Sequence, residues 1–369
     1  MNREDLVNKF TKKLIKEYDR KNAVYVKDIS CALITAGLGR SFLNDACKSS
    51  GKVSKSQIIY RKIENKELKE LQDSFRNQMG KFLRLLKIFN RNRKFLISFD
   101  ETYDEFFGNK SLVDQPLYIH AGNGKERPKQ YYEYLTVAIT SNRFNFILDG
   151  IITYRGYIVE DYIKEMVEFI KQHLEIDAVL FDRGFGWGPI KVLQELNVNY
   201  LIFWKKQGSW YKKYFKKMED GEFVIIEKSY KYNRDMTNYK LTSQFVLIKQ
   251  LKYGDKKFDW IFATNLKKDK AESYVKRYKR RWGIETIFRI TDNIRIYTTS
   301  TKIINRYFLF LSTCLIYNIW KFFQMIIGNN FTYLNFKMVF LFYMVEKDIL
   351  KPPNYNKFSE IVEKYLPIR

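Results

Sequence analysis

The sequence of 369 residues predicts an α/β fold in which helices flank a mixed sheet. Three observations support this fold class. Apolar residues in the first 90 positions have helical spacing, strand-like and helical segments alternate from Lys94 onward, and residues 205–265 hold short strand candidates between polar turns. We therefore expect four regions: a helical N-terminal region at 1–90, an α/β core at 91–204 and 266–330, a β-rich insertion at 205–265, and a helical C-terminal tail at 331–369.

The N-terminal region is expected to consist of helices. Residues 6–18 carry an apolar residue at every fourth position, which makes one stripe on a helix. Ser54 and Gln57 fit a capping box that would open a short helix ending at Ile63. With a possible helix at 41–48, this pair has the size of a DNA-binding helix-turn-helix. A purely structural helical pair is the alternative.

The core is expected to follow the order β-β-β-α-β-α-β. A long amphipathic helix over 64–89 precedes it. The predicted segments are a strand at 95–99, a hairpin of strands at 131–140 and 144–154, a helix at 159–173, a strand at 177–181, a helix at 189–196 and a strand at 200–204.

The insertion is expected to form strands, and the tail is expected to form helices. The insertion has strand candidates at 222–227, 244–251 and 260–264. The tail region has apolar runs at 307–320 and 334–344. A membrane-spanning helix needs roughly 20 apolar residues, and both runs are shorter. We therefore expect buried core helices.

The composition is strongly basic. Lys and Arg total 66 and Asp and Glu total 41, so the formal net charge is +25. An excess of this size favours nucleic acid or an anionic membrane surface as the partner. Codon bias toward lysine is the alternative explanation, although the cations are clustered along the chain.

Histidine and cysteine are scarce, which argues against several kinds of site. The histidines are His120 and His173, and the cysteines are Cys31, Cys47 and Cys314, without paired spacing. A zinc site of Cys and His ligands is therefore not expected, nor is a nucleophile activated by His. A disulfide framework is not expected either, and the first residues form no apolar signal segment, so we expect a cytoplasmic protein.

Two aspartates follow apolar runs that are predicted to be strands. Asp100 closes the run 95–99, and Asp182 closes the run 177–181. Gly184 permits a tight exit from the second strand. Ligands collect at strand ends in open α/β sheets, although a turn or N-cap aspartate is the alternative for each.

A third acid ends the segment Tyr-Lys-Arg-Arg-Trp-Gly-Ile-Glu. On a helix Tyr278, Arg281 and Glu285 share one face, because steps of three and four residues align. Such a face could hold a phosphate and a divalent cation together. A solvated helix with one Glu–Arg pair is the alternative. With Asp100 and Asp182, Glu285 matches a phosphoryl-transfer site in which carboxylates hold two Mg²⁺ ions.

These motifs resemble the DDE transposases of prokaryotic insertion sequences. One group of that family is marked by Tyr, two residues, Arg, three residues, Glu, six residues and Lys, and Tyr278, Arg281 and Glu285 have that spacing. Phe-Asp-Glu-Thr around Asp100 is similar to the first-acid motif, and Phe-Asp-Arg-Gly-Phe around Asp182 is similar to the second.

The resemblance covers roughly residues 90–325, and residues 294–300 are similar to archaeal members in particular. One position departs from the pattern, because Asp292 stands where the motif has Lys. The nearest cations are Arg289 and Arg295, of which we favour Arg295 as the phosphate contact.

The resemblance implies a ribonuclease-H-like catalytic fold and a metal-dependent DNA transposase. Asp100, Asp182 and Glu285 would be catalytic residues and ligands of two Mg²⁺ ions, with Mn²⁺ as a substitute. Tyr278 and Arg281 would contact phosphates at the element's end. Water would cleave a phosphodiester there, and the freed 3′-hydroxyl would attack target DNA. The implied partners are double-stranded DNA with terminal inverted repeats, target DNA and a second copy of the chain in a synaptic homodimer. The protein would be located in the cytoplasm, at the nucleoid.

Basic segments with aromatic residues support a DNA partner. Residues 205–217 contain six lysines and no acid, with aromatic residues between them: Lys205, Lys206, Lys212, Lys213, Lys216 and Lys217. Cations follow a phosphate backbone while aromatic faces stack on bases; a solvated lysine-rich loop is the alternative. Residues 267–281 form a second patch, with eight cations and two acids. In related transposases an aromatic residue of the insertion holds a flipped base, and Trp210 or Trp260 would do so here, with a core position as the preferred role of Trp260.

Two other functional classes stay open at this point. The Asp292 departure supports a transposase-derived DNA-binding protein without catalytic activity. The aromatic-rich tail supports a basic protein that binds membrane surfaces.

Overall fold

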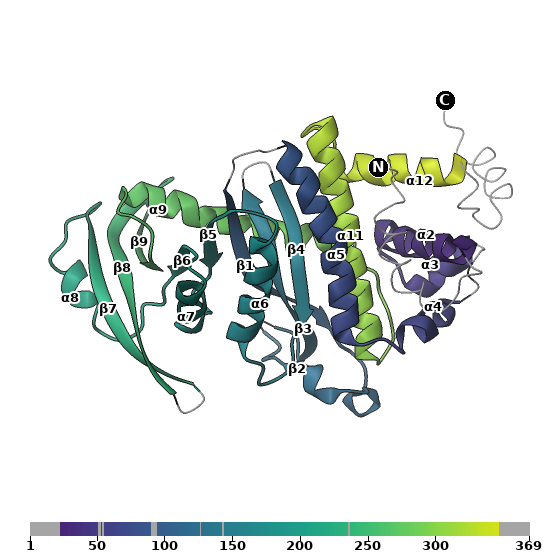
Figure 1. Ribbon diagram of the computed structural model, residues 1–369, viewed down its shortest axis with the longest axis horizontal. Coiled ribbons are helices and arrows are strands. Elements are labelled where there is room, and N and C mark those ends of the chain that lie inside the picture. The colour runs from purple at the N-terminus through teal and green to yellow at the C-terminus, as the bar shows by residue number, and fades with distance from the viewer. Residues whose placement is uncertain are drawn as a thin grey trace. The chain divides into compact units, whose positions relative to one another are not determined.

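The structure, a computed structural model, describes residues 23–50, 53, 55–89, 94–125, 127–141, 144–234 and 237–346 (Figure 1). The chain divides into two compact units. A helical unit comprises the described residues within Met1–Gln78, Phe107–Tyr118 and Arg289–Arg369, and a sheet unit comprises those within Met79–Phe106 and Ile119–Phe288. The expected helix at 6–18 lies outside the described residues. The region boundaries expected from the sequence stay predictions.

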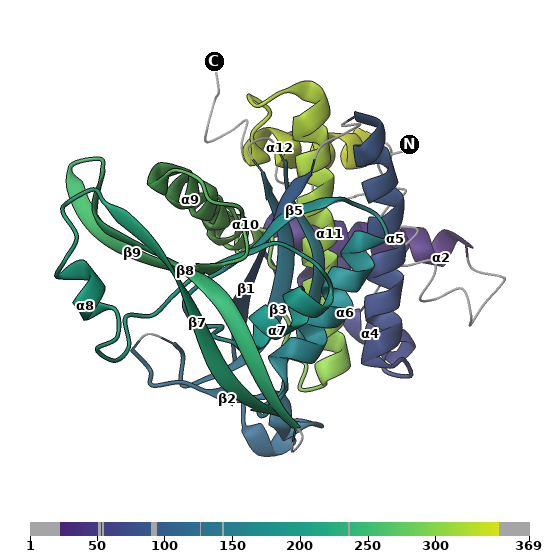
Figure 2. The ribbon, with the colours of Figure 1, turned by 60° about the vertical axis from the view of Figure 1, so that its left-hand side comes forward.

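One nine-stranded sheet organises the sheet unit (Figures 1 and 2). Its strand order is β2-β3-β1-β5-β6-β9-β8-β7, and β4 pairs with β3. β1 and β6 each run parallel to β5, and the other pairs are antiparallel. The strands are β1 (Phe95–Glu105), β2 (His120–Ala121), β3 (Gln130–Ser141), β4 (Phe144–Ile152), β5 (Ile176–Phe181), β6 (Tyr200–Phe203), β7 (Phe223–Arg234), β8 (Thr237–Tyr253) and β9 (Lys256–Thr264).

The predicted order β-β-β-α-β-α-β is confirmed between β1 and β6. The two helices are α6 (Val159–Lys171) and α7 (Gly188–Glu195), and the structure adds the two-residue strand β2. In α6 the buried residues Ile163, Met166, Val167 and Ile170 recur at helical spacing, so one face enters the core while the other stays polar. Figure 2 shows α6 and α7 beside each other, as their mutual contacts require.

The strands expected in the insertion correspond to β7, β8 and β9, and these strands continue the central sheet. β9 pairs antiparallel with β6, from Leu201 opposite Thr264 to Phe203 opposite Phe262. β8 pairs with β9 and β7 with β8, so the ladder extends outward without a break. The short helix α8 (Lys212–Phe215) lies between β6 and β7 in the chain. The insertion strands are longer than the sequence predicts. The residues toward their ends are polar, so they do not form the apolar runs on which the prediction was based.

The N-terminal helices are α2 (Ala23–Gly39), α3 (Leu43–Ser50), α4 (Ser56–Ile63) and α5 (Leu68–Phe89). Ser54 of the predicted capping box lies outside the described residues; the N-cap of α4 is Lys55, which makes no side-chain cap hydrogen bond. The Asn44 side chain on α3 instead accepts a hydrogen bond from the Ser56 amide at 3.4 Å. α5 begins at Leu68 rather than at residue 64, and its start is capped by Glu70, which accepts from the Glu67 amide.

The tail region contains α11 (Ile303–Ile327) and α12 (Tyr333–Glu346). α11 is long and apolar enough to cross a membrane by length and composition, but residues 303–309 and 311–320 are all buried, as expected of a core helix. The prediction of a buried helix over 334–344 is wrong for α12. Only Phe336, Phe340 and Met344 are buried there, because the helix rests one face on α11.

Candidate active site

Asp100 and Asp182 lie on neighbouring parallel strands of the sheet unit. The β1–β5 pairing ends at Ser98 opposite Leu180, two residues before each acid. Asp182 directly follows β5, as predicted. Asp100 does not close its strand, because β1 continues along β3 as far as Glu105. Both carboxylates therefore lie where the parallel pair ends, which is the usual place for a site in such a sheet.

Glu285 reaches the same region from a segmented helix. α9 (Ala271–Tyr278) is followed by a 3₁₀ turn, Lys279–Arg281, and then by α10 (Trp282–Thr291), which has Glu285 in its first turn. A Cβ added at Gly283 would lie 3.2 Å from Cβ and Cγ2 of Thr140 on β3. The glycine thus allows the first turn of α10 to approach the sheet closely.

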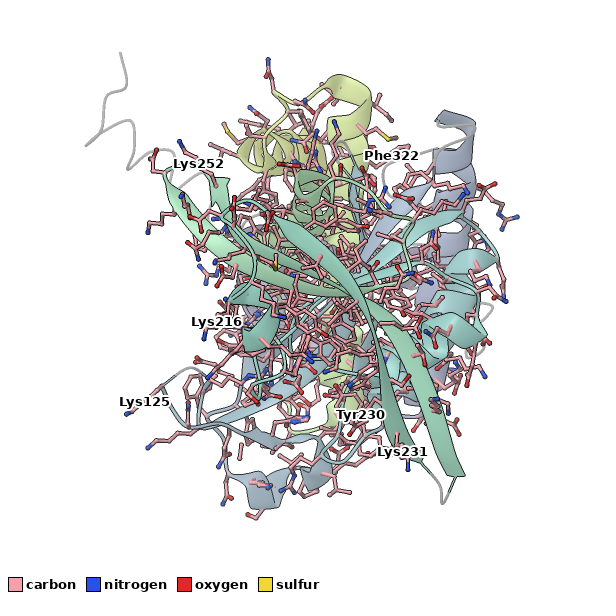
Figure 3. The ribbon with its side chains drawn as sticks, turned by 90° about the vertical axis from the view of Figure 1, so that its left-hand side faces the viewer. Lys125, Lys216, Tyr230, Lys231, Lys252 and Phe322 are labelled. Carbon is pink, nitrogen blue, oxygen red and sulfur yellow. The ribbon has the colours of Figure 1, made fainter. Side chains whose placement is uncertain are left out.

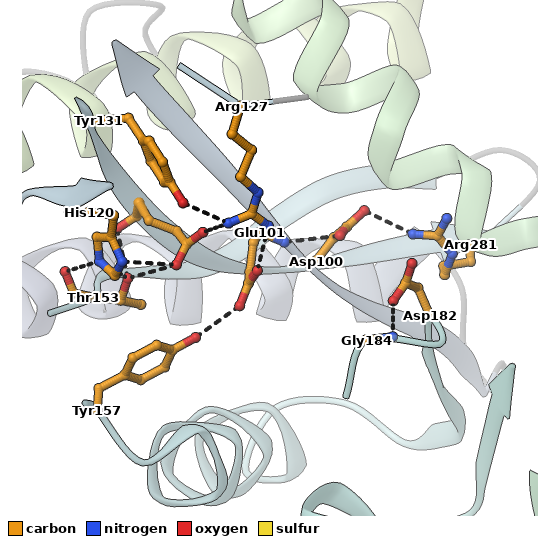
Figure 4. Close-up of polar contacts among 11 residues, drawn as sticks. Asp100, Glu101, His120, Arg127, Tyr131, Thr153, Tyr157, Asp182, Gly184 and Arg281 are labelled. Carbon is orange, nitrogen blue, oxygen red and sulfur yellow. Dashed lines mark hydrogen bonds and ion pairs between the residues drawn. The ribbon is translucent and has the colours of Figure 1, made fainter. Parts of the chain in front are cut away.

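Arg281 joins two of the three acids, and Figure 4 shows its contact with Asp100. Its Nη1 donates to Asp100 Oδ2 at 2.8 Å, and its Nη2 donates to Glu285 Oε1. Asp182 instead accepts a hydrogen bond from the Gly184 amide, which fixes the turn after β5. Arg281 is only 5% exposed, so this guanidinium is held inside the protein by the carboxylates.

The three carboxylates are close enough for the charges of Asp182 and Glu285 to affect the pKa of Asp100. Burial raises the pKa of Asp100 to about 6, Arg281 and the Glu101 amide oppose the rise, and Asp182 and Glu285 add to it. Burial works against the charge on Arg281, yet Tyr278, Asp100, Glu285 and Asp182 together hold its pKa above the ordinary value. A cationic group is therefore strongly favoured between these acids.

The donor chemistry fits divalent cations, although the side chains are not arranged around one. Within the parts of the chain that the structure describes, no three His, Cys, Asp or Glu side chains are grouped to hold a metal ion. Asp100, Asp182 and Glu285 nevertheless offer carboxylate oxygens, which Mg²⁺ and Mn²⁺ prefer. Asp100 has its charge disfavoured by burial and by the other two, so a cation there would relieve that cost.

The predicted phosphate contacts occupy different settings. Tyr278 is buried against the rings of Phe203 and Phe262, and burial raises its pKa to about 12. Arg295, in the helical unit, has its Nη2 2.5 Å from Asp292 Oδ1. The residue that replaces the motif's Lys is thus ion-paired with the cation that we expected to serve in its place.

The lysines of the lysine-rich segment in the insertion are exposed. The side chains of Lys205, Lys206, Lys212, Lys213, Lys216 and Lys217 are all exposed, and Figure 3 shows Lys216 on the outer face of the insertion. Trp210 rests edge-on against Phe245, with Lys228 Nζ 3.6 Å from its ring centroid. Trp260 is 8% exposed and belongs to the core under β8 and β9. Trp210 is therefore the more accessible of the two tryptophans.

A second polar cluster, beside Asp100, was not predicted from the sequence (Figure 4). Arg127 donates to Glu101 Oε2 at 3.2 Å and to Glu133 Oε1 at 2.5 Å. Tyr157 donates to Glu101 Oε1 at 2.9 Å, and His120 Nδ1 lies 3.6 Å from Glu133 Oε2. The side chains of Asp100 and Glu101 point to opposite faces of the sheet, because consecutive residues of a strand alternate between the two faces.

Burial dominates the charges of this cluster. It raises the pKa of Glu133 to about 7, with Glu101 adding to the rise and Arg127 opposing it. Burial lowers the pKa of His120 below its ordinary value. One signal was available in the sequence, since Glu133 is the one charged residue in the strand-like run 131–139. A charged residue inside such a strand needs a buried partner.

Comparisons with known proteins concern the family and the fold of the chain. A family model described as the transposase DDE domain matches residues 83–319, which include all three acids. Among solved structures, the piggyBac transposase in its cryo-EM synaptic complex with hairpin DNA is similar, with a TM-score of 0.56 and 11% identity over 99% of this chain and 83% of that chain. At this identity the likeness concerns the fold alone. No curated protein matches the chain.

Proposed function

Because the chain belongs to the family of transposases with a DDE domain, we propose that it cleaves DNA at the ends of a mobile element and joins the freed 3′-hydroxyls to target DNA. The observation that carries this proposal is the approach of Asp100, Asp182 and Glu285 around Arg281 in the sheet unit. We assign these three acids as the catalytic carboxylates.

We further propose that the catalytic core is ribonuclease-H-like. The parallel strands β1, β5 and β6, with β3 and β4 antiparallel on the far side of β1, support this assignment. Asp100 and Asp182 lie at the end of the parallel pair β1 and β5, and this edge of the sheet is where we place the active site.

Asp100, Asp182 and Glu285 would hold the metal, for which we propose Mg²⁺, with Mn²⁺ as a substitute. When bound, such ions stabilise the attacking and leaving oxygens of a phosphodiester. Arg281 has a separate role. A guanidinium forms bidentate hydrogen bonds with phosphate as well as with carboxylate. A DNA phosphate would therefore compete with Asp100 and Glu285 for Arg281. Glu285, whose side chain is 54% exposed, is the partner that can leave more readily.

The DNA partner is supported by charge and by the structural neighbour. The excess of 25 positive charges and the exposed lysines of residues 205–217 favour contact with a phosphate backbone. The similar piggyBac structure is a synaptic complex with hairpin DNA. We propose that this chain likewise binds the terminal inverted repeats of its element and does so as a homodimer, with Tyr278, Arg281 and Arg295 near the end of the DNA.

A cleavage assay with Asp182→Asn tests the proposal. The substrate is a labelled duplex carrying the terminal repeat that flanks the gene, incubated with Mg²⁺ or with EDTA. We expect wild-type protein to nick the substrate only with the metal, and Asp182→Asn to lose at least about 10³-fold in rate, because one of three carboxylates is gone. Asp161→Asn on the exposed side of α6 removes the same charge and is the matched control.

DNA binding, measured on the same proteins with EDTA, separates the outcomes. Asp182→Asn is expected to bind the duplex as wild type does. Full cleavage by Asp182→Asn would overturn the three-acid assignment. Binding without cleavage by the wild-type protein, with either metal, would overturn the catalytic proposal in favour of a DNA-binding protein without activity.

A further inference from the structure

A pocket of about 420 Å³ lies between β8 and the α9 segment of the sheet unit. β8 contributes Leu251 and Lys252 to its lining, and the helical side contributes Glu272, Val275, Lys276, Lys279 and Arg280. Leu251 and Val275 are buried members of the core beneath it, so the floor is apolar. None of these residues belongs to the site assigned above.

The lining is cationic and little neutralised. Four of the lining side chains are cations and one, Glu272, is an acid. The two neighbouring arginines of the same segment are paired elsewhere: Arg277 with Asp177 at 3.5 Å and Arg281 with Asp100 at 2.8 Å. Among the described residues, Lys252, Lys276 and Arg280 form no ion pair. Positive charge is therefore concentrated on the pocket side of this segment.

The β8 side of the pocket is shaped by a bulge. The register of β8 against β9 shifts between Ile248 and Leu251, and Gln250 has a φ of 44°, in the left-handed region. Asp259 on β9 holds this conformation by accepting from the Gln250 amide at 3.0 Å and from its Nε2 at 2.7 Å. A bulge redirects the side chains that follow it, here Leu251 and Lys252. Figure 3 shows Lys252 near the end of β8.

We propose that this pocket binds a backbone phosphate of DNA, with Lys252, Lys276 and Arg280 as the contacting cations. The inference rests on the proposed function and adds a second anchoring point to it. The pocket is lined from two elements, so it holds a phosphate in a fixed position, which a lysine-rich loop does not. Apolar atoms of the adjoining sugar would contact the floor formed by Leu251 and Val275. A free nucleotide carries the same phosphate chemistry, and the experiment below distinguishes the two sources.

The test compares two double variants that remove equal charge. Lys276→Gln/Arg280→Gln alters the pocket, whereas Lys81→Gln/Lys164→Gln alters exposed cations on α5 and α6 that do not line it. Binding of a fluorescent terminal-repeat duplex is measured by anisotropy in EDTA at several NaCl concentrations. We expect the pocket variant to lower the slope of log affinity against log salt by about 0.9, for the one phosphate that is released, and to weaken binding at least roughly tenfold at low salt. The control should change the slope by less than about 0.3.

Two single variants guard against a folding defect in the α9 segment as the cause of weaker binding. Lys252→Gln on β8 should weaken binding roughly tenfold, because one phosphate contact is lost, and Glu272→Gln should strengthen it. Thermal unfolding of every variant checks that the fold is intact.

Equal losses in the pocket and control variants would overturn the pocket proposal alone. Binding of ATP that is lost in Lys276→Gln/Arg280→Gln while duplex binding is unchanged would also overturn it, since the pocket would then serve a free nucleotide. Failure of the wild-type protein to bind the duplex would overturn the proposed function and the pocket together.

Discussion

Replacing Arg281 with methionine removes the buried cation that Asp100 and Glu285 share. The Asp100 side chain is 21% exposed and the Glu285 side chain is 54% exposed. Leaving a fully buried charge without its partner costs about 3–5 kcal/mol, whereas an exposed pair contributes less than about 1 kcal/mol. Asp100 lies between these limits, so we expect Arg281→Met to lower the free energy of unfolding by about 2–3 kcal/mol at pH 8.

The loss should be smaller at low pH. Burial already raises the pKa of Asp100 to about 6, and Arg281 opposes that rise, so the pKa climbs further without Arg281. A folded-state pKa above the unfolded value means that the folded protein holds the proton more tightly, and its stability falls as pH rises through that interval. At pH 5 Asp100 of the variant is protonated and needs no cation. We therefore expect roughly half of the pH 8 loss, since one pKa unit corresponds to about 1.4 kcal/mol.

Urea unfolding followed by circular dichroism at pH 5 and pH 8 measures both quantities. Arg280→Met, at the adjacent position without a carboxylate partner among the described residues, is the matched control and should change stability by less than about 0.5 kcal/mol. Adding Asp100→Asn to Arg281→Met should restore more than half of the loss, because the unpaired charge is then absent. An equal loss at both pH values, or no recovery in the double variant, would refute the electrostatic explanation.

Two further predictions concern the neighbouring parts of the sheet unit. Burial raises the pKa of Glu133 to about 7, so the stability of the wild-type protein should fall as pH rises from about 4.5 to 7; Glu133→Gln should flatten this dependence in thermal melts at pH 5, 6 and 7, and an unchanged slope would contradict the assignment. Gly283→Ala places a Cβ 3.2 Å from Thr140, so we expect a loss of about 1–2 kcal/mol together with slower DNA cleavage, whereas unchanged melting and cleavage would show that α10 adjusts freely.

The order of strands and helices along the chain from β1 to β6 and the position of Asp182 at the end of a strand could be predicted, because both depend on local pattern. The alternation of β-branched and aromatic residues marks β3 and β4, and helical spacing marks α6. Asp182 was placed correctly after β5, since residues 178–181 are all apolar and Gly184 follows. The length of β1 was underestimated, because residues 101–105 are polar and are held in the strand by pairing with β3, which is a tertiary effect.

Ion pairs across long sequence separations could not be predicted. Arg127 lies 26 residues from Glu101, and Arg281 lies 181 residues from Asp100. Spacing along one helix suggested that Arg281 would face a phosphate, but it cannot show that a distant carboxylate occupies the guanidinium. The Asp292–Arg295 pair was within reach of the sequence, because an acid and a cation three residues apart attract each other.

The β6–β9 pairing makes the insertion a poor candidate for exchange between proteins. Excising residues 205–265 would strip β6 of its antiparallel neighbour and uncover Phe203 and Tyr278, which now pack against Phe262. The shortened protein would present an unprotected edge strand, and such edges promote aggregation. Chimaeras with altered DNA preference are therefore better built by changing the lysines of residues 205–217, while the hydrogen-bonded strands β7, β8 and β9 are left in place.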